Sequence, residues 1–434
     1  MRRNLEVHAG PGARGRPANG TVARRLLPVA GLLLLAGCGG RAAPAFVVRD
    51  SAGVGIAESR APAWPAGGGW TLAPDPAVRI GSLDGPPELQ FDGVVDALRL
   101  PDGRIVVADG GSGEVRFYGS DGAFLRRAGG TGEGPGEFRM ISGMGRVGGD
   151  SVWVYDYSLR RFTMLPTDGG APRVVSVGAD LPTLVAVGRT SDGGWVMAEA
   201  WAARRLAGGG GASGPGGAAQ APRTGLRRDP VAYVRIGPDG MLRDTLGLFP
   251  GRELELRIDA EAGRMMMINV PFAHLSSHAM RAGRLFIGDE TTFDVGEYRP
   301  DGTPVRRLRI PGLDLTLTDD DVQAALQQVL AGLPESARPG IRALWRSYDM
   351  PPTRPAYSRL VVDAAGDLWV GEYAHRPATA RHWRVFDPEG RWLGVVTVPP
   401  DFRITCIDEA GVLGVARDSL DVERVSLFPL DQGG

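Results

Sequence analysis

The sequence predicts an all-β fold, a β-propeller of six blades, and three observations support that prediction. Glycine (65) and proline (34) are abundant among the 434 residues, which favours many turns and few long helices. Short apolar segments alternate with Asp-Gly, Ala-Gly and Gly-Asp turn pairs along most of the chain. The same order of strands and turns returns again and again, as expected of a repeat architecture.

The repeat is clearest between Val94 and Phe138. Four strand-like segments joined by tight turns pair as an antiparallel meander, which is one propeller blade. The strands are expected at 97–100, 105–108, 115–118 and 124–128, with turns at Asp102-Gly103, Gly110–Gly113 and Asp121-Gly122.

Five further repeats are recognised by their turns. In chain order these turns are Gly149-Asp150 and Asp168-Gly169, Asp192-Gly193 and Asp239-Gly240, Ala282-Gly283 and Asp301-Gly302, Ala365-Gly366 and Glu389-Gly390, and finally Ala410-Gly411.

The last repeat ends with its third strand, at residues 422–428, and lacks a fourth. Val78–Gly81 precedes a segment that echoes residues 129–138, so we expect it to supply the missing strand and close the ring. Closure removes the unpaired backbone groups that an open edge exposes. We expect residues 47–56 to add a further strand to that last blade.

Two insertions interrupt the repeats. Residues 206–228 are rich in glycine, serine and alanine and predict a flexible loop. Residues 313–350 contain Thr318 as a good N-cap before three aspartates, followed by apolar residues at helical spacing. This helical insertion, between blades four and five, is either a packing brace or a lid or partner-docking element.

The N-terminal region has the pattern of an export signal. Arg24 and Arg25 precede a short apolar run, Leu26–Ala36, which cannot span a bilayer. Residues 35–38 resemble the lipobox of bacterial lipoproteins, which implies acylation of Cys38; the alternative is a plain signal peptide with a chance cysteine. We therefore expect an upstream segment and signal peptide at 1–38, a short tether at 39–45 and the propeller at 46–430.

The repeats resemble NHL-type six-bladed propellers. The resemblance is strongest at Ile105–Asp109, Val115–Phe117, Asp121-Gly122 and Gly134–Phe138. The chain also looks like the uncharacterised six-bladed propeller lipoproteins of bacteria. That resemblance implies a lipid-anchored protein of the cell envelope, on the outer membrane or facing the periplasm.

Polar residues end the second strand of each repeat and are the candidate ligand-binding residues. If the repeat phase is right they lie near one face around a common axis; they are Asp109, Asp156, Glu199, Asp289, Glu372 and Arg417. One interpretation is that each acid accepts backbone N–H bonds from a turn. The other is a ring of carboxylates at the channel mouth that binds a cation or a polar ligand.

Metal and nucleophile signals are weak. Resemblance to propeller lyases and lactonases implies a central metal held by histidine, asparagine or carboxylate ligands. Beyond the signal this chain offers only Asn269 and four histidines for that purpose, namely His274, His278, His375 and His382. No motif of a zinc protease, serine hydrolase or phosphate-binding loop is present in the sequence.

A net charge of −1 gives no reason to expect a nucleic-acid partner. The sequence therefore favours a binding or assembly module for a protein, peptide or carbohydrate. The alternatives are a hydrolase or lyase that uses the carboxylates, with or without a metal, and a purely structural envelope protein. No cofactor is assigned.

Overall fold

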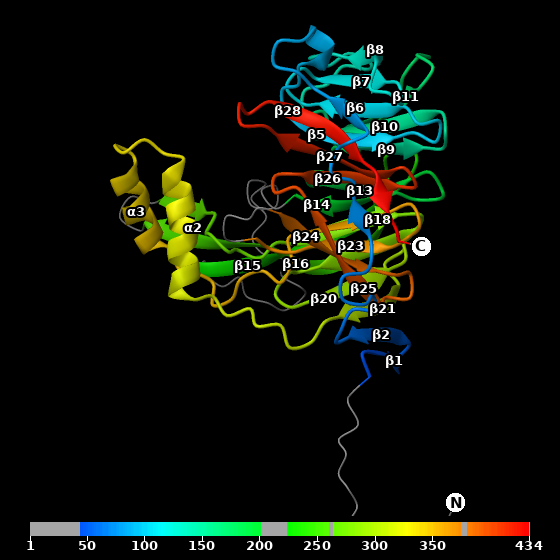
Figure 1. Ribbon diagram of the computed structural model, residues 1–434. Coiled ribbons are helices and arrows are strands. Elements are labelled where there is room, and N and C mark those ends of the chain that lie inside the picture. Colours follow the sequence, from blue (N-terminus) through cyan, green and yellow to red (C-terminus); the bar gives the residue numbers. More distant parts are fainter. Residues whose placement is uncertain (1–43, 201–223, 260–263, 375–379, 434) are drawn as a thin grey trace, which may run out of the picture. The chain divides into compact units, whose positions relative to one another are not determined.

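The computed structural model describes residues 44–200, 224–259, 264–374 and 380–433 (Figure 1). The expected signal peptide, Cys38, most of the tether, residues 206–223 of the expected loop, and His375 lie outside the described residues. The described chain is nearly all β, with two α-helices and many small sheets, and is propeller-like.

Six sheets of four or more strands follow one another along the chain. Each of them contains at least three antiparallel pairs of neighbouring strands. The first contains β5 (Val94–Arg99), β6 (Ile105–Asp109), β7 (Glu114–Tyr118) and β8 (Phe124–Gly129). The second contains β9 (Ile141–Val147), β10 (Ser151–Asp156), β11 (Arg161–Pro166) and β12 (Arg173–Ser176). The third contains β13 (Leu184–Arg189), β14 (Trp195–Glu199), β15 (Gly225–Ile236), β16 (Leu242–Asp259) and β17 (Arg264–Ile268).

The fourth sheet has β18 (Ser277–Arg281), β19 (Arg284–Gly288), β20 (Asp294–Tyr298) and β21 (Pro304–Arg309), extended by β2 (Val54–Ser59) and β1 (Phe46–Ser51). The fifth has β22 (Arg359–Val362), β23 (Leu368–Gly371), β24 (Arg381–Phe386) and β25 (Trp392–Val398). The sixth has β26 (Arg403–Asp408), β27 (Gly411–Arg417), β28 (Glu423–Phe428) and β4 (Val78–Ile80). A small pair joins β3 (Thr71–Leu72) to β29 (Leu430–Asp431), and a 3-10 turn, η1, spans Pro87–Leu89.

Glycines at the predicted turns are required by geometry. Gly240 has a φ of +82°, and a side chain there would overlap the carbonyl oxygen of Ser176 in the neighbouring sheet. Gly411 has a φ of +137°, and a Cβ there would overlap the carbonyl of Phe428. Both positions therefore need a residue without a side chain.

The apolar core lies between neighbouring sheets. One cluster joins Val78 and Ile80 of β4 to Val107 of β6 and Leu413 of β27. Another cluster joins the first sheet to the second, and its members include Phe117, Phe138 and Val154. Each sheet thus buries its faces against its neighbours, as strand-rich repeats must.

The strand from near the front of the chain pairs where it was predicted. β4 runs antiparallel to β28, with Ile80 opposite Val425 and Val78 opposite Leu427. This pairing is confirmed.

The prediction for residues 47–56 is wrong. They form the β1–β2 hairpin, whose β2 strand runs parallel to β21 in the fourth sheet, with Ile56 opposite Arg307. Ala57 of β2 is completely buried and Ile56 nearly so, so the hairpin covers apolar surface at the edge of β21.

The third sheet is longer than the repeat predicts. Residues 225–228, expected in the flexible loop, belong to β15, with Arg228 opposite Glu253 of β16. The Arg228 guanidinium donates to the carbonyl oxygens of Gly251, Leu275 and Asp289 at 2.6 Å each, which fixes this extension.

The predicted helical insertion is confirmed as α2 (Asp319–Ala331) and α3 (Arg338–Ser347). Thr318 caps α2 and forms a reciprocal capping box with Asp321. The helices lie beside the β15–β16 extension (Figure 1), where Glu255 accepts the N–H of Asp349 at 3.2 Å. In the part of the chain that is described, neither helix has the length and apolar character needed to cross a membrane.

Candidate functional site

Asp109 at the end of β6 is fully buried and braces its own sheet. Its carboxylate accepts the N–H of Asp92 at 3.0 Å and the hydroxyl of Ser112 at 2.8 Å. It also forms an ion pair with the nearly buried Arg116 at 3.1 Å. Burial raises the pKa of Asp109 against these favourable contacts.

Asp156 and Glu199 are buried in the same way in the next two sheets. Asp156 accepts the N–H groups of Arg139 at 2.6 Å, Met140 at 3.2 Å and Leu159 at 2.8 Å. Glu199 accepts the N–H of Ala232 at 3.2 Å. Asp156 thus holds the chain just before β9 and β11, whereas Glu199 holds a residue inside β15.

In the fourth sheet the buried acid is Glu290, one residue after the predicted Asp289. Asp289 is only half-buried and accepts the N–H and hydroxyl of Thr291. Glu290 is 1% exposed and accepts the N–H of Leu275 at 3.0 Å and the hydroxyl of Ser277. Burial raises the pKa of Glu290.

Glu372 and Arg417 are different again. Glu372 is half-buried and pairs with Arg384 at 2.7 Å. Arg417 is exposed and pairs with Asp421 and Glu423. In this sheet Glu423 takes the bracing role, because it accepts the N–H groups of Gly93 and Val94 at 2.9 and 2.6 Å.

The side-chain contacts described above for the predicted site residues thus lie within each residue's own sheet. Among the residues that the structure describes, no three His, Cys, Asp or Glu side chains are grouped so that they could hold a metal ion. His274 and His278 are not partners either: His274 contacts Glu253 at 2.7 Å, and His278 contacts the hydroxyl of Tyr233 at 3.0 Å.

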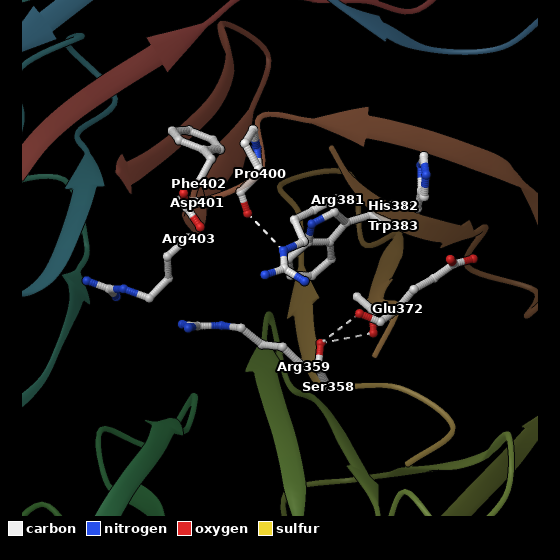
Figure 2. Close-up of a pocket in the computed structure, with 11 residues that line it drawn as sticks. Ser358, Arg359, Glu372, Arg381, His382, Trp383, Pro400, Asp401, Phe402 and Arg403 are labelled. Carbon is white, nitrogen blue, oxygen red and sulfur yellow. Dashed lines mark hydrogen bonds between the residues drawn. The ribbon is translucent and has the colours of Figure 1, made fainter. Parts of the chain in front are cut away.

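A pocket of about 270 Å³ lies between the fifth and sixth sheets and brings a different set of residues together (Figure 2). Three arginines line it: Arg359, Arg381 and Arg403. Each is the first residue of its strand, in β22, β24 and β26. Because β22 and β24 both run antiparallel to β23, they start at the same end of the sheet, which places two of the arginines together.

Two of these arginines are held by backbone carbonyl groups. The Nε–H of Arg381 donates to Pro400 at 2.8 Å. Arg403 donates to Val94 at 2.6 Å and to Val95 at 3.0 Å. Figure 2 shows the Arg359 and Arg403 side chains extended toward the same side, with Arg381 beside them.

The Arg359 side chain is exposed at the pocket, and its guanidinium has no hydrogen bond or ion pair with any residue in the described ranges. Burial lowers the pKa of Arg359, and the charge of Arg403 lowers it further. Two acids also line the pocket, Glu372 and Asp401. Since Glu372 is already paired with Arg384, the pocket carries an excess of positive charge.

Two titratable groups on neighbouring strands complete the surroundings of Arg359. Burial raises the pKa of Asp96 on β5 to about 6, although Arg403 and Arg359 both favour its ionised form. Burial and the charge of Arg359 lower the pKa of His278 on β18 to about 4, so this imidazole is neutral near pH 7. The Tyr233 hydroxyl lies 3.0 Å from both His278 Nδ1 and the Ser276 hydroxyl.

The sequence did not predict the arginine set. The chain has 49 basic residues of the lysine and arginine type, and all of them are arginine, so residue type alone singles out none. The one feature that these arginines share in the sequence is that Arg359, Arg381 and Arg403 are each the first residue of a strand. This feature indicates a common site only when the positions of the strands in space are known.

The fold and the pocket together define a propeller-like all-β protein with an arginine-lined pocket. No protein-family model matches the chain, and no curated protein matches it. Among solved structures it is similar to an exported protein from Bacteroides fragilis, at 10% identity over 84% of this chain and 96% of that one, with a TM-score of 0.43.

It is also similar to virginiamycin B lyase from Staphylococcus aureus, at 10% identity over 82% of this chain and 99% of that one, with a TM-score of 0.40. A DUF4221-family protein from Bacteroides vulgatus matches at 8% identity over 84% of this chain and 99% of that one, with a TM-score of 0.45. Likenesses this distant transfer no activity to this chain.

Proposed function

We propose that this protein is an exported six-bladed β-propeller that binds a partner through an anionic group of that partner, held at the arginine pocket. The partner is a protein, peptide or carbohydrate that carries a carboxylate, phosphate or sulfate. The six successive sheets and the pairing of β4 with β28 support a ring of six blades closed by its N-terminal strand.

The unpartnered guanidinium of Arg359 is the observation that carries this proposal. Arg359 is exposed to solvent at the pocket, so its planar group of donors is available to an incoming ligand and matches a carboxylate or phosphate in two parallel hydrogen bonds. Arg381 and Arg403 are already oriented by backbone carbonyl groups and keep donors free. An anion entering the pocket meets a site that needs little rearrangement.

The sequence supports a location in the cell envelope. Arg24 and Arg25, the apolar run to Ala36 and the lipobox-like residues before Cys38 favour export and acylation of Cys38. The propeller then stands at the cell envelope, on the outer membrane or facing the periplasm. Mass spectrometry of the membrane-extracted protein tests the anchor, because the lipidated chain begins at Cys38 and carries acyl groups.

The binding proposal is tested with the full chain, purified in detergent. Titration with sodium sulfate, followed by tryptophan fluorescence because Trp383 lines the pocket, measures anion binding directly. Peptides with a free or an amidated C-terminus and a galacturonate oligosaccharide then compare the carriers of the anion. We expect Arg359→Ala to lose at least tenfold in affinity, as one charge-assisted pair implies.

Arg346→Ala is the matched control, because Arg346 is exposed on α3 and does not line the pocket. It should bind sulfate as the parent does. Equal affinity of the parent and Arg359→Ala for every anion would remove the proposed function.

A second candidate is a hydrolase or lyase, and His278 is the observation that favours it. This imidazole is neutral near pH 7, one of its nitrogens contacts Tyr233, and it lies close enough to Arg359 to respond to its charge. A neutral imidazole near an anion-binding arginine can accept a proton as a general base, although a pKa of about 4 makes it a weak one. Turnover of an ester or lactone panel that His278→Ala abolishes would establish this alternative; no turnover leaves the binding function.

A further inference from the structure

We propose that Asp96 makes anion binding at the arginine pocket dependent on pH, with tight binding when Asp96 is protonated and weak binding when it is ionised. The inference rests on the proposed function above and concerns the regulation of the same pocket.

A β-bulge places Asp96 beside the anchor of Arg403. The pairing of β5 with β6 shifts register here, because Val94 lies opposite Asp109 while Asp96 lies opposite Ala108. The bulged segment presents the carbonyl groups of Val94 and Val95, and the Arg403 guanidinium donates to both. Asp96 is the next residue along the strand, and the charge of Arg403 acts on its carboxylate.

The Asp96 carboxylate is half-buried and has no ion-pair partner within 4.0 Å among the described residues. It accepts the N–H of Ala97 at 2.9 Å, and the N–H of Met144 on β9 also stabilises its charge. The charged groups that face it are Arg403 from β26 and Arg359 from β22. Ala108 lies opposite on β6, and β27 brings no charged residue before the exposed Arg417.

Competition between Asp96 and the ligand follows from this arrangement. The ionised carboxylate offsets part of the positive charge of Arg359 and Arg403 and repels an incoming anion. Protonation removes that charge and leaves both arginines to the ligand. Burial raises the pKa of Asp96 to about 6. The carboxyl group therefore changes from protonated to ionised between mildly acidic and neutral pH. His278 stays neutral over that range, with a pKa of about 4.

The test measures the Kd of sulfate for the full chain at pH 5.0 and pH 7.5, because sulfate keeps its double charge at both values. One unit charge several ångströms away in a partly screened site changes affinity by about tenfold or more. We expect the parent to bind about tenfold more tightly at pH 5.0 than at pH 7.5. Asp96→Asn should bind tightly at both pH values, and Arg359→Ala weakly at both.

Two further variants keep the outcome interpretable. Asp96→Ser also lacks the charge and is smaller, so agreement between it and Asp96→Asn excludes an effect of one particular side chain. Asp401→Asn removes an exposed acid that lines the same pocket and should leave the pH dependence in place. Circular dichroism at both pH values verifies that each variant is folded.

The two proposals fail separately. If the parent binds sulfate equally well at pH 5.0 and pH 7.5 while Arg359→Ala loses binding, the role of Asp96 is wrong and the arginine pocket stands. If Asp96→Asn and Asp96→Ser keep the full pH dependence of the parent, the role of Asp96 is wrong as well. If Arg359→Ala binds as the parent does, the pocket itself is wrong and the inference falls with it.

Discussion

Buried carboxylates in this protein hold polypeptide backbone. Asp109 shows the principle most clearly, because it takes the N–H of Asp92, the hydroxyl of Ser112 and the charge of Arg116 in one buried place. Glu290 and Glu423 do similar work at other sheets. These contacts account for a periodic acid at a strand end by the local geometry of the repeat.

Replacement of Asp109 by alanine should destabilise the protein by about 2 kcal/mol, because it removes one of the two carboxylates paired with the buried Arg116 and leaves the N–H of Asp92 without its acceptor. Urea unfolding of the full chain, followed by fluorescence, measures this change. Arg417→Ala is the comparison: the Arg417 guanidinium is exposed to solvent, so its removal should shift the unfolding transition much less than the removal of Asp109. Equal effects of the two substitutions would contradict the bracing role of Asp109.

Asp367 gives a pH-dependent prediction. Burial and the nearby charge of Asp363 raise its pKa to about 7, from 3.8 in the unfolded chain. The folded state therefore holds a proton that the unfolded state has released, so stability falls as the pH rises from about 4 to about 7 and the loss is complete above that range. Asp367→Asn removes this loss and should stabilise the protein at pH 8 by roughly 3–4 kcal/mol.

Urea unfolding of the parent and of Asp367→Asn at pH 4, 6 and 8 tests that sign. The two proteins should be nearly equal at pH 4 and should diverge as the pH rises. A difference between them that does not change with pH would show that Asp367 is ionised throughout.

At the scale of secondary structure, the α2 helix depends on its first turn. Thr318 accepts the N–H of Asp321, and the Asp321 side chain accepts from the Thr318 backbone in return. Thr318→Ala should cost about 1 kcal/mol of helix stability. Hydrogen exchange of the α2 amides should then be about fivefold faster, whereas the exposed substitution Gln327→Ala should leave their exchange rates nearly unchanged.

Features with a local cause were predictable from the sequence. The turns around Gly240 and Gly411 need glycine because of backbone sterics, so the sequence predicted them. The start of the α2 helix was predicted from Thr318 and the three aspartates that follow it. In the fourth sheet the buried acid that holds backbone is Glu290 and not its neighbour Asp289, a difference that sequence spacing cannot resolve when adjacent acids end a strand.

Features that depend on distant contacts were not predictable in the same way. The β1–β2 hairpin pairs with β21 far along the chain, and residues 225–228 are fixed by carbonyl groups from three other segments. The arginine pocket joins the starts of three strands from two sheets, and the anchor of Arg403 is a bulge in the first sheet. No local sequence pattern predicts these contacts between distant segments.

For the whole molecule, the decisive contact is the pairing of β4 with β28, which joins the front of the chain to its end. Arg79 lies directly opposite Ser426 in this ladder. Neighbouring residues across an antiparallel pair are close enough for a disulfide. The double variant Arg79→Cys with Ser426→Cys should therefore crosslink on mild oxidation, and non-reducing peptide mapping identifies the bond.

The crosslink should also raise stability by about 2–4 kcal/mol, since it closes a very long loop in the unfolded chain. Arg79→Cys combined with Ser176→Cys is the control, because Ser176 belongs to the second sheet, where it pairs with Arg161. That control should stay reduced under the same oxidation. Were the Arg79 and Ser426 pair to stay reduced as well, the N-terminal strand would not hold the last sheet in solution, and a ring of six blades closed by that strand would have to be given up.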